Sequence, residues 1–221
     1  LCDETPETLE EAGHRFGVNH LYTSHEDLLD RERVDAVVVA TPTHTHCQVV
    51  TYAASRGVHI FCEKPLCTSM KEAEEMRKAL SQSKVVFMMG FNMRFSPNIR
   101  RVEQLVRSGF VGEILSMHIG FNVPGPEKWP AETDFYFRRE SGGGALFDSG
   151  SHALDICQWL AGDVDKIYAS ILSEEQGYDV AASISLETRK NAVASIKVSW
   201  RASWPMVRVE VFGTKGLVEN H

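Results

Sequence analysis

Two charged side chains in Glu63-Lys64-Pro65 directly follow a short apolar segment, residues 58–62, which predicts a buried parallel strand. A charged pair at the carboxyl end of such a strand contributes little to packing. It is well placed for chemistry, because open α/β sheets bind ligands outside the carboxyl ends of their strands. Pro65 fixes the turn and disfavours helical geometry at Lys64. We therefore expect Lys64 to lie at the rim of a ligand-binding crevice.

Thr41-Pro42 follows another apolar segment, residues 34–40, in the same way. This segment is nearly continuous, which is typical of a strand buried on both faces. Sequential parallel strands place both turns at the same edge of a sheet, where Thr41 offers a hydroxyl group. The helix expected from residue 43 offers free backbone N–H groups beside it. Taken alone, Thr41-Pro42 is explained equally well as a simple strand-to-helix turn.

His44 and His46 form a His-x-His pair, a spacing with which some metal hydrolases begin a metal site. At the start of a helix, however, residues two apart point to different sides. No acidic residue stands nearby in the sequence. A metal-dependent hydrolase that uses His44, His46 and Asp148 is therefore the less favoured interpretation, and a measurement of metal content would decide it.

A second group of polar residues follows the glycines Gly142–Gly144, in a segment that predicts a mostly buried helix over about 144–160. Asp148 and His152 are four residues apart and share one helix face, and Asp155 lies close to it. Such a carboxylate can orient a histidine base and balance its charge. There are two alternatives: a buried histidine whose hydrogen bond is made by a helical neighbour, and a metal site formed by all three residues. Gly150 permits close approach of a ligand, which fits a pocket better.

Asp3 ends a presumptive strand and precedes a helix expected over 5–16, with Thr5 as its N-cap. In dinucleotide-binding folds an acid at this place binds the ribose hydroxyl groups of the adenosine. The next residues, Glu4-Thr5-Pro6, include no Arg or Lys to bind a 2′-phosphate, which favours NAD over NADP. A solvated acid at a strand end is the alternative, and it is favoured if Asp3 is considered by itself.

The first half of the chain alternates strands with helices, which implies a parallel, right-handed, doubly wound sheet. The expected strands are 34–40, 58–62 and 85–89, and the expected helices are 5–16, 26–30, 43–56 and 69–81. Ser24 and Ser69 are the expected caps of the second and fourth helices. We assign residues 1–95 to this parallel α/β domain.

The pattern changes after Gly90, where several segments alternate apolar with polar residues and predict an antiparallel sheet with one covered face. These strands are 114–123, 166–173, 180–187, 192–200 and 207–212. A helix over 96–108 precedes them, and the helix 144–160 separates the first strand from the second. We assign residues 96–221 to a second, α+β domain.

Composition excludes several classes of protein. The chain has 221 residues, a net charge of −7 and no basic block, so a nucleic-acid partner is not expected. No apolar run approaches the length of a membrane span. The five cysteines form no Cys-x-x-Cys pair and predict reduced thiols in a cytoplasmic protein. The chain begins with Leu1, inside a presumptive strand, and closes on the start of another, so we expect a fragment truncated at both ends.

A set of motifs in this order closely resembles the Gfo/Idh/MocA oxidoreductases, which include glucose–fructose oxidoreductase and inositol 2-dehydrogenase. The motifs are Asp3, Thr41-Pro42-x-x-x-His46, Glu63-Lys64-Pro65, Gly90-Phe91-Asn92-x-Arg94-Phe95 and the run from Gly142 to Asp155 that contains Asp148-x-Gly150-x-His152. The resemblance covers nearly the whole chain. It implies a Rossmann domain, an α/β domain with a mostly antiparallel sheet, a nicotinamide between them, and a homo-oligomer formed through the C-terminal sheet.

The resemblance also implies roles for individual residues. Lys64 would contact the reacting hydroxyl and the nicotinamide ribose, and its charge would stabilise a developing alkoxide. His152 would be the general acid/base, and Asp148 would position it and the substrate. The residues implied to line the cofactor pocket are Thr41, Pro42, His46 and Glu63, with Arg94 reaching cofactor or substrate. The implied reaction moves a hydride between a secondary alcohol of a sugar, cyclitol or other polyol and NAD.

Some features depart from the family pattern. Thr43 stands where many members have Asn, and Met93 where many have Arg. The family's first strand and Gly-x-Gly-x-x-Gly turn, a unit of roughly 30 residues that cradles the pyrophosphate, are missing. We therefore expect this chain by itself to bind NAD poorly, which calorimetry would test. A non-catalytic, dinucleotide-sensing regulator is the alternative function, although such a protein has no need to keep Lys64, Asp148 and His152.

Overall fold

The computed structural model describes residues 1–129 and 134–220. The chain divides into two compact units, Leu1–Gly90 and Phe91–His221, each with its own hydrophobic core. The sequence placed this division slightly later, between residues 95 and 96. The structure assigns the intervening 3₁₀-helix η2 (Asn92–Phe95) to the second unit, because η2 packs on that unit's helices α5 (Pro97–Arg107) and α6 (Ser151–Ala161).

The first unit contains a parallel three-stranded sheet of order β1-β2-β3, which confirms the strand–helix alternation expected from the sequence. Its strands are β1 (Ala36–Val39), β2 (His59–Cys62) and β3 (Phe87–Met89). Its helices are α1 (Pro6–Phe16), α2 (His25–Arg31), α3 (His46–Ser55), which follows the 3₁₀-helix η1 (Thr43–Thr45), and α4 (Met70–Gln82). The Ser24 and Ser69 side chains cap α2 and α4 as predicted.

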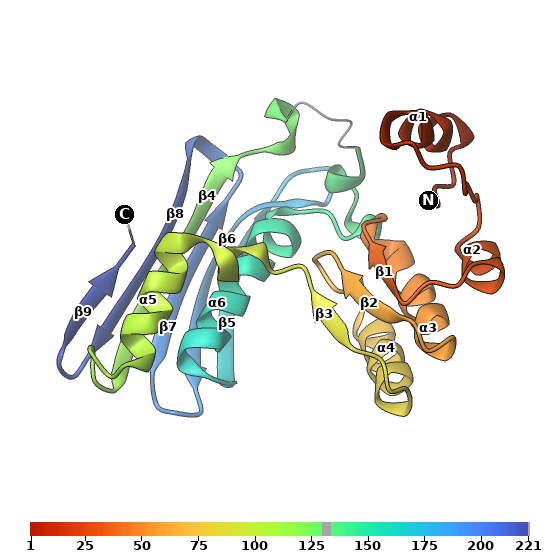
Figure 1. Ribbon diagram of the computed structural model, residues 1–221. Coiled ribbons are helices and arrows are strands. Elements are labelled where there is room, and N and C mark those ends of the chain that lie inside the picture. The colour runs from red at the N-terminus through yellow and green to blue at the C-terminus, as the bar shows by residue number, and fades with distance from the viewer. Residues whose placement is uncertain (130–133, 221) are drawn as a thin grey trace. The chain divides into compact units, whose positions relative to one another are not determined.

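Helices α3 and α4 pack against each other over the same face of this sheet (Figure 1). Right-handed crossovers between strands taken in order place successive helices on one side. Side chains on the covered face, such as Val39 and Ile60, are buried, whereas Val38 on the other face is 72% exposed. The expectation that segment 34–40 is buried on both faces is therefore wrong. An apolar run predicts a strand, but it does not predict which face of the sheet the helices cover.

The second unit contains a six-stranded sheet of order β5-β6-β7-β4-β8-β9. Neighbouring strands are antiparallel except β4 and β7, which run parallel, so the mostly antiparallel sheet is confirmed. The strands are β4 (Ile114–Pro124), β5 (Val164–Ser173), β6 (Asp179–Thr188), β7 (Val193–Ser199), β8 (Arg201–Gly213) and β9 (Gly216–Glu219).

Helices α5 and α6 lie on one face of this sheet and close the second core (Figure 1). Ile99 and Ile156 extend from the helices into this core, where they join inward-facing strand residues such as Ile119 and Ile196. Short 3₁₀-helices connect β4 to α6: η3 (Pro126–Lys128), η4 (Asp134–Phe137) and η5 (Arg139–Ser141). In the described part of the chain, no helix has both the length and the apolar character needed to cross a membrane.

Candidate functional site

The carboxyl ends of the three parallel strands meet at one edge of the first unit's sheet. Thr41-Pro42 follows β1 and Glu63-Lys64 follows β2, so the structure brings the two predicted turns to the same edge. Backbone bonds extend the ladder there: the Glu63 N–H donates to the Val39 carbonyl at 2.8 Å, and the Gly90 N–H donates to the Cys62 carbonyl at 2.7 Å. Lys64 is half-buried, and its peptide bond to Pro65 is cis.

The Glu63 carboxylate lies directly against the backbone of Gly90, at the end of β3. A Cβ atom added to Gly90 would stand 2.8 Å from Glu63 Oε2 and 3.0 Å from Oε1. Oε2 also accepts the backbone N–H of Lys64 at 3.3 Å. Glycine thus permits a close approach that a side chain at position 90 would block. The result is a carboxylate held at the carboxyl edge of the sheet, suited to accept hydrogen bonds from hydroxyl groups.

His46 connects the two turns. Its side chain is 1% exposed, its Nδ1 lies 3.0 Å from the Pro65 carbonyl oxygen, and its Nε2 lies 2.9 Å from the Thr41 carbonyl oxygen. Both partners are backbone carbonyl acceptors, so the imidazole bridges the two turns through its ring N–H. The sequence predicted that His46 lines the cofactor pocket. The structure shows that it holds together the two turns that carry Thr41 and Lys64.

The neighbouring residues of this turn are more open. Thr41, Pro42 and His44 are exposed, and the Thr45 hydroxyl lies 2.7 Å from the Thr41 hydroxyl and 2.8 Å from the Pro42 carbonyl oxygen. Because both ring nitrogens of His46 face backbone carbonyls, the His-x-His pair lacks one of the ligands that a metal site would need. Within residues 1–129 and 134–220, no three His, Cys, Asp or Glu side chains are grouped to hold a metal ion.

Asp3 has a local structural role. It follows an isolated β-bridge between Cys2 and Tyr22, and its Oδ1 accepts the backbone N–H of Thr5 at 2.9 Å. Thr5 occupies the N-cap position of α1, but its side chain makes no capping bond. The turn into α1 is therefore stabilised by Asp3. A carboxylate has about four acceptor sites, so this bond leaves acceptor capacity on Asp3 for a ribose hydroxyl.

In the second unit, Asp148 and His152 lie at the start of the helical segment over the sheet. Asp148 belongs to a π-helix, Leu146–Gly150, and His152 to the first turn of α6. Their exposed fractions are 9% and 8%. The single α-helix predicted over 144–160 is thus corrected to a π-helical turn followed by an α-helix. Turns of this kind are rare and occur frequently at functional sites.

Two aromatic rings set the plane of the His152 imidazole. Phe121 of β4 stacks on it, with ring centroids 5.9 Å apart and an interplanar angle of 15°. Phe91 meets it edge-on, with centroids 6.2 Å apart and an angle of 72°. A stacked ring and an edge-on ring restrict different rotations of the imidazole. The sequence offered no signal for Phe121, because its place opposite α6 depends on how β4 packs.

Asp179 is a second residue of this region that the sequence did not predict. It begins β6, and its Oδ2 accepts the backbone N–H of Leu146 at 2.7 Å. Gly144 has a φ of +110°, and its Cβ position is filled by the Asp179 carboxylate. Asp179 thus caps the start of the π-helix from a distant part of the sequence. Nothing in the sequence around Asp179 identifies the helix that it caps.

Arg94 and Asp155 form an ion pair between η2 and α6. Arg94 Nε donates to Asp155 Oδ2 at 2.8 Å and Nη2 donates to Oδ1 at 2.6 Å. The hydrogen bond to Asp155 raises the pKa of the Arg94 guanidinium. The sequence predicted that Arg94 reaches cofactor or substrate, and the structure gives its guanidinium a protein partner.

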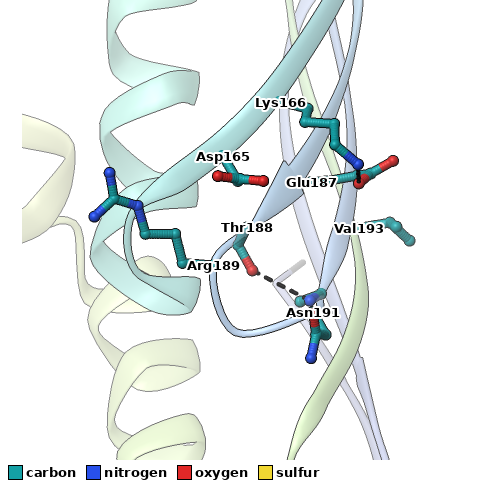
Figure 2. Close-up of a pocket in the computed structure, with 8 residues that line it drawn as sticks. Asp165, Lys166, Glu187, Thr188, Arg189, Asn191 and Val193 are labelled. Carbon is teal, nitrogen blue, oxygen red and sulfur yellow. Dashed lines mark hydrogen bonds and ion pairs between the residues drawn. The ribbon is translucent and has the colours of Figure 1, made fainter.

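A pocket lies elsewhere in the second unit, beside the turn that joins β6 to β7 (Figure 2). Neither Asp148 nor His152 lines it. The Lys166 ammonium in it is paired with Glu187 at 2.7 Å, so the lining offers no excess of either charge there. The lining residues are Asp165, Lys166, Glu187, Thr188, Arg189, Asn191, Ala192 and Val193. The predicted site residues are thus unrelated to this pocket.

Comparisons with known proteins match both units. Residues 1–91 match the profile described as oxidoreductase family, NAD-binding Rossmann fold, and residues 99–219 match the GFO/IDH/MocA C-terminal domain. The chain is 30% identical to a myo-inositol 2-dehydrogenase from Thermotoga maritima over 226 residues, covering 99% of the chain and 66% of that relative. It is also 30% identical to a 2,7-anhydro-N-acetylneuraminate hydratase from Mediterraneibacter gnavus, covering 89% of the chain and 54% of that relative.

Among solved structures, levoglucosan dehydrogenase in complex with NADH superposes with a TM-score of 0.91 at 25% identity, covering 99% of this chain and 62% of that one. The chain therefore spans about two thirds, or less, of the length of these relatives. The family matches cover residues 1–91 and 99–219, which include the predicted site residues except Arg94.

Proposed function

The chain belongs to the Gfo/Idh/MocA family of oxidoreductases, and from this premise we propose that its whole protein is an NAD-dependent dehydrogenase of polyols. The reaction moves a hydride between a nicotinamide and a secondary alcohol carbon of a sugar, cyclitol or related polyol. The observation that carries the proposal is the buried His152, held between two aromatic rings one helical turn from the buried Asp148. A protein that only senses a dinucleotide has no need of this arrangement.

The first unit supplies groups that fit a nicotinamide dinucleotide. Its parallel sheet ends in an edge with the Thr41 hydroxyl, the Glu63 carboxylate resting on Gly90, and the Lys64 ammonium. Hydroxyl and carboxylate groups at the carboxyl ends of parallel strands suit the sugar and amide groups of a nucleotide. We assign cofactor contacts to Asp3, Thr41, Pro42, Glu63 and Lys64. When bound, NAD supplies the acceptor for the hydride.

We favour NAD over NADP because of the surroundings of Asp3. A carboxylate repels the 2′-phosphate of NADP and accepts hydrogen bonds from the free hydroxyls of NAD. No Arg or Lys follows it in Glu4-Thr5-Pro6. The Asp3 bond to Thr5 fixes this carboxylate at the start of α1. Assay of the whole protein with each cofactor tests the preference.

In the second unit, His152 takes the proton of the substrate hydroxyl while the hydrogen on the same carbon leaves with its electron pair as hydride. Asp148, buried in the preceding turn, positions the substrate and His152. The Lys64 ammonium stabilises the negative charge that develops on the substrate oxygen. The reverse reaction returns the proton from His152 to the same oxygen.

The catalytic assignment is tested with Lys64→Ala and His152→Ala in the whole protein. Removing a general acid/base costs about 10²- to 10⁴-fold in rate, and we expect both variants to lose nearly all turnover. Lys71→Ala and His14→Ala change exposed residues of the same types and serve as controls. Normal turnover in both site variants would show that these residues do not carry the chemistry.

The substrate is best sought with a panel of inositols and aldoses, monitored for net formation of NADH. The readout matters because relatives at equal identity are named for dehydrogenation and for hydration. Hydration adds water to the sugar with no net oxidation or reduction, whereas dehydrogenation oxidises the sugar and converts NAD to NADH. Consumption of a sugar without NADH would argue for the second chemistry and against our proposal.

We further propose that the whole protein is a homo-oligomer formed through the outer face of the six-stranded sheet. This face lies opposite α5 and α6, and it carries Tyr168 and Leu172, which are 76% and 62% exposed. Ser185, opposite Tyr168 in the register, is exposed on the same face. We expect light scattering to give a multiple of the monomer mass, and Ser185→Arg to reduce it. A monomeric parent protein would exclude this interface.

We place the protein in the cytoplasm, because all five cysteines are free thiols. Alkylation of these thiols in intact cells, followed by mass spectrometry, tests the assignment. Thiols oxidised in the cell would contradict it.

A further inference from the structure

The Arg94–Asp155 pair has the geometry of a clamp. Its two parallel bonds, at 2.8 and 2.6 Å, use one edge of the guanidinium and both oxygens of the carboxylate. Such bidentate pairs fix orientation as well as distance, which a single bond between flexible side chains does not. The pair joins residues 61 positions apart in the sequence, so it is a tertiary contact between η2 and α6.

Burial makes this contact obligatory for Asp155. Its side chain is 7% exposed, whereas that of Arg94 is 41% exposed. A carboxylate buried to this degree has lost most of its contact with water, and a charged, hydrogen-bonded partner compensates for that loss. The Arg94 guanidinium also lies over the Trp159 ring, 5.3 Å from its centroid. Arg94 is therefore held by two residues of α6, one turn apart.

These contacts lie on the same side of α6 as His152. Positions 152, 155 and 159 are separated by three and four residues, the spacing of neighbours on one helix face. Phe91, which meets the His152 ring edge-on, immediately precedes η2. If η2 moved away from α6, Phe91 would no longer be held against the imidazole. The bond between Arg94 and Asp155 opposes that movement.

We propose that Arg94 and Asp155 are a positioning pair, which fixes η2 on α6 and thereby fixes the orientation of the His152 imidazole through Phe91. In this role Arg94 acts through protein contacts instead of binding cofactor or substrate. The effect on catalysis rests on the function proposed above. The effect on the imidazole does not.

The test combines two readouts on two variants. The double variant Arg94→Gln, Asp155→Asn removes both charges, so no unpaired charge is left buried and the fold is retained. Arg94→Lys keeps the charge but lacks the planar fork. In ¹H–¹³C spectra of the 221-residue chain, we expect the His152 ring signals to move in both variants, because the Phe91 ring current at the imidazole changes. His152→Gln identifies these signals.

In the whole protein, misplacement of His152 should lower kcat by roughly 10- to 100-fold, with little change in the KM for NAD. The loss should be smaller for Arg94→Lys than for the double variant. Arg107→Gln, which removes the exposed guanidinium that pairs with Glu103 at 3.1 Å in the same unit, is the control and should change neither readout.

The two readouts separate the possible failures. His152 ring signals that stay in place in the double variant would overturn the proposal, whatever the activity. A raised KM for NAD with unchanged kcat would also overturn it, because it would make Arg94 a cofactor ligand. If the parent protein oxidises no polyol, the proposed function fails while the ring signals still decide whether the pair positions His152.

Discussion

Gly90 shows how one missing side chain shapes the candidate cofactor edge. A Cβ atom there would stand within 3.0 Å of the Glu63 carboxylate, which is the mobile end of a flexible side chain. In Gly90→Ala the carboxylate must therefore move, at little cost to folding. A hydrogen bond to a charged group contributes about 1.5–3 kcal/mol, so we expect the Kd of NAD for the whole protein to rise roughly 10- to 100-fold. Calorimetry measures the change.

The matched control for this substitution is Gly216→Ala. An added Cβ at Gly216 meets nothing within 4 Å, and the residue lies in the other unit. It should leave both NAD affinity and the midpoint of unfolding unchanged. If Gly90→Ala behaves in the same way, Glu63 lies outside the cofactor site and its assignment must be withdrawn.

His46 carries a second prediction, on stability. In His46→Leu the partly buried carbonyls of Thr41 and Pro65 lose the imidazole that bridges them. A buried polar group left without a partner costs about 1–3 kcal/mol, and we expect the free energy of unfolding of the chain to fall by about this amount. Urea titration measures it. His44→Leu changes an exposed ring two residues away, and an equal loss in that variant would mean that the His46 bonds contribute nothing.

Among the elements, the start of the segment that carries Asp148 and His152 depends on a remote cap. In Asp179→Ala the Leu146 N–H loses its acceptor, and the carboxylate beside Gly144 is removed. Loss of a helix cap typically costs about 1 kcal/mol, so we expect the second unit to be destabilised by about that much. Tryptophan fluorescence in urea reports it. The exposed Asp165, also beside a strand start, is the control, and equal effects of Asp165→Ala would refute the cap.

The same segment marks the limit of what the sequence predicts. The positions of the strands and helices followed from local periodicity and caps, as at Ser24 and Ser69, because those signals lie within a few residues. The π-helical turn at Leu146–Gly150 did not, since Asp179 and Gly144 determine its start together. Strand β8 begins at Arg201, before the predicted 207, because Arg201 pairs with Pro124 in β4. Pairing partners distant in sequence leave no local signal.

For the candidate site, the sequence identified the residue types and the sheet edge but not the partners. Lys64, Asp148 and His152 stand where the strand and helix patterns placed them. The partner of Arg94 was not predicted, although Asp155 was noted on the same helix face as His152. Which of several acidic residues pairs with an arginine depends on how the elements pack against each other. The sequence alone does not distinguish between these acidic residues.

At the scale of the whole molecule, the two cores are separate and unequal. The first core lies under one face of a three-stranded sheet, whereas the second lies between six strands and two helices. Hydrophobic stabilisation grows with the apolar area buried, so the second unit should be the more stable. The chain carries probes that distinguish the units. All four tryptophans, at positions 129, 159, 200 and 204, belong to the second unit, and the buried Cys47 and Cys62 belong to the first.

We therefore expect two unfolding transitions in urea. Burial raises the pKa of Cys47 to about 11 and that of Cys62 to about 12, so neither thiol reacts readily while the first core is folded. Labelling followed by mass spectrometry should detect both at lower urea than the change in tryptophan fluorescence. Cys157, buried in the second core with a pKa raised to about 11, should become reactive with the fluorescence change. If all three thiols and the tryptophans change together, the units unfold as one cooperative structure.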